Sequence, residues 1–197
     1  MAAKPRVIRN LFSEKVHSGI KTFIDEYVQF LPMKTDDTDF MRKYINDVDF
    51  FKDLHHKITE YASDMFEENL KPSYSFLSLY ENGGQCRLHI DRPQCYRTID
   101  YLITQEDSNP WPLYIGSPIS DEKRKELDEV EQLSEYIAEH EEQILSSTKW
   151  SKLLMNPNDA ALYSGTHSWH YRPTKSNGRS SLVFWHFVKE DFNGPLQ

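Results

Sequence analysis

The chain has 197 residues, 38% of them hydrophobic and 13% aromatic, which suits one domain with an apolar core. Its net charge of −8 disfavours non-specific binding to phosphate backbones, so we expect no nucleic-acid partner. The sequence contains no apolar run of about 18 residues, so no membrane span is expected. It also lacks the apolar stretch of a secretory signal near Met1, which favours a cytoplasmic protein whose two cysteines are free thiols.

The first 70 residues have the pattern of helices that support another part of the fold. Apolar residues recur at three- and four-residue steps between Val16 and Tyr27, where Ser13 can cap the helix. A second stripe of this kind extends from Phe51 to Met65 and predicts a helix that ends near Leu70.

The pattern changes to short strands from Tyr74 onward. Alternation and β-branched or aromatic composition predict strands, separated by turn residues, at 74–80, 85–90, 97–104, 111–116, 160–164 and 180–188. Helices followed by strands indicate an α+β domain whose sheets close on themselves. We therefore expect one domain over 1–197, with its barrel at 74–188.

A charged helical segment interrupts these strands at residues 120–150. Its apolar residues form a roughly heptad-like stripe that includes Leu127, Val130, Leu133, Ile137 and Ile144. An outer helix packed on the sheet is the favoured interpretation, because amphipathic helices usually bury their stripe. The alternatives are a lid over an active site and a homodimer contact.

The tripeptide His89-Ile90-Asp91 carries the first chemical signal. Alternate residues of a strand share a face, so His89 and Asp91 point the same way. An imidazole and a carboxylate so placed form two-thirds of a 2-His-1-carboxylate metal site, which leaves other metal positions open.

A second signal lies in residues 158–181. A short strand and a turn at Gly165 precede His167 and His170, and either imidazole has the chemistry of the third ligand. Further on, Arg179 and Ser181 share a strand face, where an arginine can hold a carboxylate through two parallel hydrogen bonds.

In their order and spacing, these motifs make residues 80–188 resemble the 2-oxoglutarate/iron(II) oxygenases of the prolyl-4-hydroxylase-like group. The matching features are the His-x-Asp motif, the Asp-Ala-Ala-Leu-Tyr-Ser-Gly stretch from Asp159, and a distal histidine nine residues before Arg179. That spacing favours His170 over His167 as the distal ligand. The resemblance implies a double-stranded β-helix, which is a cupin-like jelly-roll barrel, with the N-terminal helices packed outside.

The resemblance also implies the cofactors and the residues that hold them. His89, Asp91 and His170 would bind iron(II), and Arg179 and Ser181 would hold the far carboxylate of 2-oxoglutarate. Tyr80 and Tyr101 would line the 2-oxoglutarate pocket, although ordinary barrel tyrosines are an equal alternative. The co-products would be succinate and CO2, with O2 as oxidant and ascorbate as a supporting reductant. Since Asp91 is present, hydroxylation is expected rather than halogenation.

Residues for the substrate are predicted less directly. Arg92 follows Asp91 at the expected barrel mouth, and an inward Arg97 would favour an acid group. His167 and Trp169, next to the distal ligand, are further candidates, whereas His186 is expected to be structural. The expected substrate is a small molecule such as a free amino acid. A prolyl-type protein hydroxylase and a non-catalytic cupin-like metal-binding or ligand-sensing protein are the alternatives.

Overall fold

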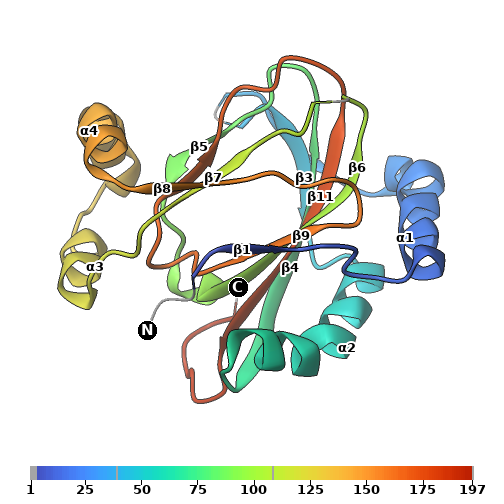
Figure 1. Ribbon diagram of the computed structural model, residues 1–197, viewed down its shortest axis with the longest axis horizontal. Coiled ribbons are helices and arrows are strands. Elements are labelled where there is room, and N and C mark those ends of the chain that lie inside the picture. Colours follow the sequence, from blue (N-terminus) through green and yellow to red (C-terminus); the bar gives the residue numbers. More distant parts are fainter. Residues whose placement is uncertain (1–3, 39, 108, 197) are drawn as a thin grey trace.

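Two antiparallel sheets form the centre of the protein in the computed structural model, which describes residues 4–38, 40–107 and 109–196 (Figure 1). The larger sheet has seven strands in the order β1-β9-β6-β11-β4-β3-β2. Its strands are β1 (Arg6–Ile8), β2 (Lys34–Asp36), β3 (Arg42–Asn46), β4 (Leu70–Tyr80), β6 (Arg97–Gln105), β9 (Ala160–Tyr163) and β11 (Ser180–Lys189).

The smaller sheet has four strands in the order β5-β10-β7-β8. They are β5 (Cys86–His89), β7 (Leu113–Gly116), β8 (Trp150–Leu153) and β10 (His170–Arg172). Residues of both sheets line one cavity, which therefore lies between the sheets.

Helices cover the outer face of the larger sheet. Here α1 (Glu14–Tyr27) continues into the short helix η1 (Val28–Phe30), and α2 (Asp49–Phe66) lies along β4 (Figure 1). Ile20, Phe51 and Ile58 from these helices join Trp185 and Val183 of β11 in one buried cluster. Burial of large apolar side chains stabilises this packing, so the helices fix one face of the sheet that carries the cavity on its other face.

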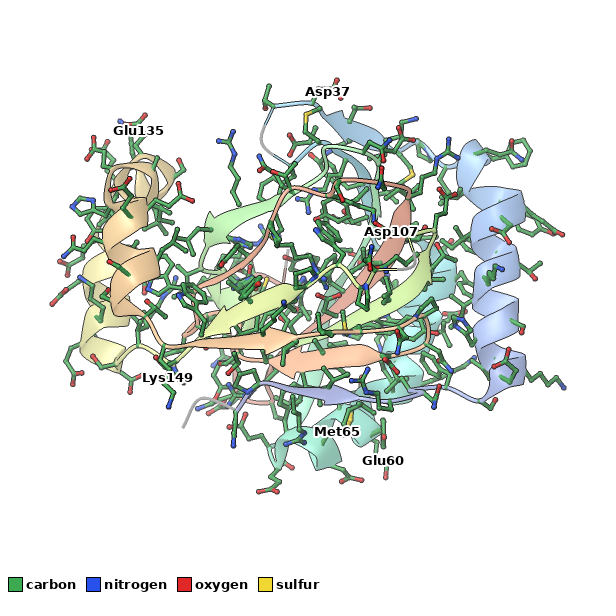
Figure 2. All side chains as sticks on the ribbon, turned by 45° about the horizontal axis from the view of Figure 1, so that its top comes forward. Asp37, Glu60, Met65, Asp107, Glu135 and Lys149 are labelled. Atoms are coloured by element: carbon green, nitrogen blue, oxygen red, sulfur yellow. The ribbon has the colours of Figure 1, made fainter. Side chains whose placement is uncertain are left out.

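The segment at 120–150 forms two helices and a strand, where one charged helix was predicted. The helices are α3 (Asp121–Asp128) and α4 (Leu133–Ser147), and β8 follows them. Leu127 and Ile137 of the predicted stripe pack against Leu88, Ile90 and Trp169 of the smaller sheet and its connections, whereas Glu135 points away from the sheet (Figure 2). This packing favours the outer-helix interpretation. The described residues of α3 and α4 do not line the cavity between the sheets, but α4 residues line a neighbouring cavity that His89 also borders.

The structure confirms both N-terminal helices and corrects the view of residues 1–70 as purely helical, because β1, β2 and β3 also lie there. These three strands are short or largely polar, so hydrophobic alternation gave no signal for them. The predicted strands at 74–80, 85–90, 97–104, 111–116, 160–164 and 180–188 all have counterparts. In the described part of the chain, no helix has the length and apolar character needed to cross a bilayer.

Candidate metal centre

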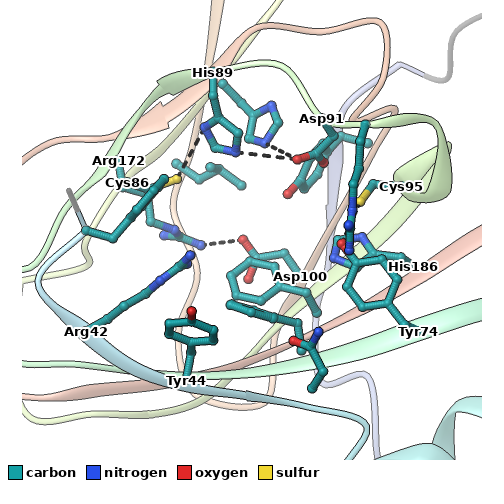
Figure 3. A pocket seen from close by; sticks show the side chains of 18 of the residues that line it. Arg42, Tyr44, Tyr74, Cys86, His89, Asp91, Cys95, Asp100, Arg172 and His186 are labelled. Atoms are coloured by element: carbon teal, nitrogen blue, oxygen red, sulfur yellow. Dashed lines mark hydrogen bonds and ion pairs between the residues drawn. The ribbon is translucent and has the colours of Figure 1, made fainter. Parts of the chain in front are cut away.

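Three side chains from β5, β10 and the segment after β5 converge at one point of the cavity (Figure 3). His89 ends β5 and pairs across the sheet with His170, which begins β10. Asp91 Oδ1 lies 3.5 Å from His89 Nε2 and 3.7 Å from His170 Nε2. Metal–ligand bonds are about 2.0–2.2 Å long, so neighbouring ligand atoms of one ion lie roughly 3–4 Å apart, as these three do.

Main-chain oxygens fix the orientation of both imidazoles. His89 Nδ1 lies 2.7 Å from the Arg87 carbonyl oxygen, and His170 Nδ1 lies 2.9 Å from that of Ser168. In a neutral ring, the nitrogen that faces a carbonyl oxygen is the protonated one, so each Nε2 carries the lone pair once its ring is neutral. Both lone pairs are therefore available to one metal ion beside Asp91.

Protonation at this cluster follows from burial and from the three neighbours. Burial, followed by the charge of His89, lowers the pKa of His170 to about 4, so that ring is neutral at pH 7. Burial also lowers the pKa of His89, but Cys86 and Asp91 outweigh burial and hold it well above its usual value. Burial raises the pKa of Asp91, and His170 and His89 outweigh it, so the net pKa is lowered. Without a metal ion, a proton on His89 supplies the positive charge beside Asp91. A bound metal ion would displace that proton and supply the positive charge instead.

Asp91 is held by its main chain, while one carboxylate oxygen is left free. Its N–H donates to the Gly165 carbonyl oxygen over 2.9 Å, and Arg124 Nη1 of α3 donates to the Asp91 carbonyl oxygen over 2.7 Å. Asp91 Oδ2 is buried without a hydrogen-bond partner in the described structure. A buried, unpartnered carboxylate oxygen is costly, and a bound cation would offset that cost.

Gly165 leaves room for this carboxylate, and Gly165→Ala tests that contact. A Cβ at this position would lie 2.0 Å from Asp91 Oδ2 and 2.8 Å from the Cys95 carbonyl oxygen. We expect Gly165→Ala to lower the free energy of unfolding by about 1–3 kcal/mol and to weaken metal binding, because Asp91 must move. Denaturant unfolding and calorimetric titration with Zn(II) measure the two effects. Gly19→Ala is the control, since its Cβ would meet no atom within 4 Å; unchanged metal affinity in Gly165→Ala would contradict the expectation.

The three side chains border a cavity of about 530 Å³ that reaches the surface. This volume is within the usual range for a small-molecule site. Its tyrosines and phenylalanines come from the larger sheet and from Phe40, and its basic residues are Lys34, Arg42, Arg92 and Arg172. The cavity can therefore hold small acidic molecules beside the metal site.

Two of these arginines differ in what already pairs with them. Arg172 Nη2 lies 2.7 Å from Asp100 Oδ2, and both side chains are almost fully buried, so this pair is internally neutral. Arg42 instead donates from Nη1 to the Tyr80 hydroxyl over 2.9 Å and lies 4.2 Å from the Phe40 ring centre. Its Nε is buried without a hydrogen-bond partner, and no carboxylate of the described residues forms an ion pair with it. Arg42 is thus a cation in the cavity wall with bonding capacity left over.

The structure does not place Arg179 or Ser181 in the cavity. The Arg179 side chain is 71% exposed and lies 3.9 Å from Glu81. Ser181 shares its strand face with Val183 and Trp185, which pack under the N-terminal helices. The prediction chose the wrong face of β11, because nearly every residue of this strand is buried and the sequence pattern does not mark its inner side.

The same face assignment explains two further corrections on β6. Tyr101 packs against Trp185 in the helix-covered core, and its hydroxyl lies 2.7 Å from His17 Nδ1, so it does not line the cavity. Arg97 is buried on that outer side, where Nη2 forms an ion pair of 2.6 Å with Glu68. Arg97 therefore has an acidic partner, as expected, but that partner is Glu68 of the protein and not a substrate.

The remaining predicted residues divide between the cavity and the outside. Tyr80 and Arg92 line the cavity. His167 lies outside it, with Nε2 3.1 Å from Asp121, and Trp169 is buried against α3 and α4. Of the two candidate distal histidines, the structure therefore brings His170 to Asp91.

Sequence reasoning missed several cavity residues. His186, expected to be structural, faces the cavity with Nδ1 3.0 Å from the Thr98 hydroxyl, and burial lowers its pKa to about 4. Arg172 lies two residues after His170, so strand alternation could have placed it on the same face. Arg42 lies on β3, a strand that the pattern did not reveal.

Solved structures of 2-oxoglutarate/iron(II) oxygenases are among the structural neighbours of this chain, which shares their mixed α/β fold with antiparallel sheets. The sequence matches no protein-family model, and it matches no curated protein.

Three neighbours illustrate the likeness. The carbocyclase SnoK from nogalamycin biosynthesis, described as non-heme and alpha ketoglutarate dependent, has a TM-score of 0.73 at 12% identity, over 95% of this chain and 80% of that one. HygX from Streptomyces hygroscopicus, solved with nickel and 2-oxoglutarate bound, has a TM-score of 0.62 at 12% identity, over 95% of this chain and 84% of that one. A prolyl-4-hydroxylase from Pseudomonas putida has a TM-score of 0.62 at 9% identity, over 94% of this chain and 92% of that one. At these identities the likeness establishes the fold, and function must be argued from the site.

Proposed function

We propose that this protein is an iron(II)- and 2-oxoglutarate-dependent dioxygenase that hydroxylates an aliphatic C–H bond of a small molecule such as a free amino acid. Succinate and CO2 are the co-products of the proposed reaction, and ascorbate is expected to support turnover. The observation that carries the proposal is the convergence of His89, Asp91 and His170 on one side of a cavity that is large enough for two small molecules.

The donor set fits iron(II). Two neutral imidazole nitrogens and one carboxylate on one side of an ion form the facial triad typical of non-haem iron(II) oxygenases. When bound, iron would supply the activation of O2, and the protein would orient the reactants and exclude side reactions. The open side of the triad faces the cavity, where 2-oxoglutarate and substrate would enter.

In this proposal Arg42, instead of Arg179, holds the far carboxylate of 2-oxoglutarate. A dicarboxylate needs a cation that no protein carboxylate already neutralises, which excludes Arg172. Lys34, Arg42 and Arg92 meet that condition among the described cavity residues, and Arg42 is the least exposed of them, with a buried Nε that has no hydrogen-bond partner. The Tyr80 hydroxyl, 2.9 Å from Arg42 Nη1, fixes the guanidinium and can add a hydrogen bond to the same carboxylate. This retains the sequence-based role of Tyr80.

The finer structural expectations are part of the same proposal. We infer that the two sheets form a double-stranded β-helix and that residues 1–197 are one oxygenase domain, since elements from Arg6 to Lys189 contribute to the two sheets. A homodimer through residues 120–150 would have to use the exposed polar side of α3 and α4, because their apolar stripe is packed. A cytoplasmic location stays an expectation from the sequence.

Anaerobic titration with iron(II) and 2-oxoglutarate tests the proposed function. A metal-to-ligand charge-transfer absorption band is expected only when both are present, because the band needs the keto acid chelated to iron. Succinate release in air, screened over small acids, amino acids and a proline-containing peptide, then separates a small-molecule hydroxylase from a prolyl-type protein hydroxylase. Metal binding without the band would instead favour a non-catalytic cupin-like metal-binding or ligand-sensing protein.

A further inference from the structure

The described lining of the cavity is positively charged, although the chain has a net charge of −8. Its acids are Asp91, which faces the metal site, and Asp100, which is paired with Arg172. Lys34, Arg42 and Arg92 have no carboxylate partner among the described residues. The cavity is thus arranged for anions.

With the proposed cofactors bound, the cavity lining would have more positive than negative charges. This step rests on the proposed function. Iron(II) with Asp91 has one positive charge, and a 2-oxoglutarate dianion turns the sum to one negative charge, which Arg42 balances. Lys34 and Arg92 are then the basic residues of the described lining that remain without a carboxylate partner. Both are exposed to solvent, and their positive charges can attract a second anion to the cavity.

Arg92 is well placed to receive that anion. Its guanidinium carbon lies 4.8 Å from the centre of the Tyr74 ring, and the Tyr74 hydroxyl lies 3.0 Å from Cys95 Sγ. Stacking on a buried ring orients a guanidinium without neutralising it. Because Arg92 directly follows Asp91, an acid held there keeps the rest of its molecule next to the metal site.

The two free arginines serve different parts of the cavity. Arg42 lies on the side of Tyr44 and Arg172 (Figure 3). Tyr74 lies across the cavity, beside His186 and Cys95, and the Arg92 guanidinium stacks on its ring. His89 and Asp91 of the metal site lie along the upper edge of the same view, with Asp91 toward Cys95 (Figure 3). One arginine can therefore bind 2-oxoglutarate while the other binds substrate.

We propose that the substrate is a carboxylic acid without a neighbouring free ammonium group, and that Arg92 binds its carboxylate. The aromatic walls, which include Phe76, Phe184 and Tyr163, suit an apolar body between the acid and the metal. Both acids of the described lining are already engaged, so an α-ammonium group inside the cavity would find no free carboxylate there. This narrows the proposed function away from free amino acids.

Calorimetric titration with matched compounds tests the proposal. The probes are 3-phenylpropionate, 3-phenylpropanamide and phenylalanine, together with the same three forms on straight chains of four to eight carbons. Each is titrated into the protein alone and into protein with Zn(II) and 2-oxoglutarate. We expect at least one acid to bind about tenfold or more tightly than both its amide and its amino-acid form.

Variants identify the residue responsible. Arg92→Gln should bring the acid to within about threefold of its amide, while Arg179→Gln, an arginine change outside the cavity, should keep the preference; thermal unfolding checks that both fold. An acid that binds no better than its amide on every skeleton, absence of binding by all probes, or a preference that survives Arg92→Gln would overturn the proposal. If the protein prefers the acid but does not bind 2-oxoglutarate, the proposed function is overturned and the role of Arg92 in binding a carboxylate stands.

Discussion

Asp91→Ala is expected to reduce iron- and 2-oxoglutarate-dependent succinate release by at least about 100-fold. Asp91 contributes the one carboxylate among the three converging donors, with Oδ1 3.5 Å and 3.7 Å from the two Nε2 atoms. Loss even of groups that only orient metal ligands costs about 10- to 100-fold, so loss of a ligand costs at least as much. The measurement is succinate formed per enzyme under saturating iron(II), 2-oxoglutarate and the best substrate found.

Asp121→Ala is the matched control, because it removes a carboxylate from the exposed start of α3, where the side chain is 86% exposed. Its turnover should stay within about twofold of the unchanged protein. A metal-binding readout separates the cause from misfolding: a metal at about 100 times its Kd adds about 2.7 kcal/mol to the free energy of unfolding, and Asp91→Ala should lose that gain. Full turnover in Asp91→Ala would contradict the triad.

Arg42→Gln is expected to raise the Kd for 2-oxoglutarate by about 30-fold or more. Arg42 is the cavity arginine whose Nε is buried without a partner, and its Nη1 is held by the Tyr80 hydroxyl. Removing one partner of a buried, hydrogen-bonded charge pair typically costs about 2–5 kcal/mol, which exceeds tenfold in Kd. The Kd is read from the iron-dependent absorption band in an anaerobic titration.

Arg179→Gln provides the comparison for Arg42→Gln, and it also tests the role that the sequence suggested for Arg179. Because this side chain is 71% exposed and outside the cavity, its replacement should leave the Kd for 2-oxoglutarate unchanged. The reverse result, weak binding in Arg179→Gln and normal binding in Arg42→Gln, would reject the assignment of Arg42. Arg172 is less suitable for this test, since its loss would leave the Asp100 carboxylate buried and unpaired.

The sequence by itself determined the local chemistry of the candidate site. The two-residue period of a strand placed His89 and Asp91 on one side. The family resemblance, through the nine-residue spacing to Arg179, selected His170 over His167. It also identified both N-terminal helices and most strands of the two sheets, because their apolar periodicity reports a buried face. These features depend on neighbours in the chain, which a sequence displays directly.

Only the tertiary structure decided which arginines belong to the cavity. β11 is buried on both faces, so its sequence could not show that Leu182, Phe184 and His186 face inward while Ser181 and Val183 face the helices. Arg42 reaches the cavity from β3 through its pairing with β4, a contact between segments about 35 residues apart in the chain. Alternation fixes that two residues share a face, but the face that becomes the inside depends on what packs against each side.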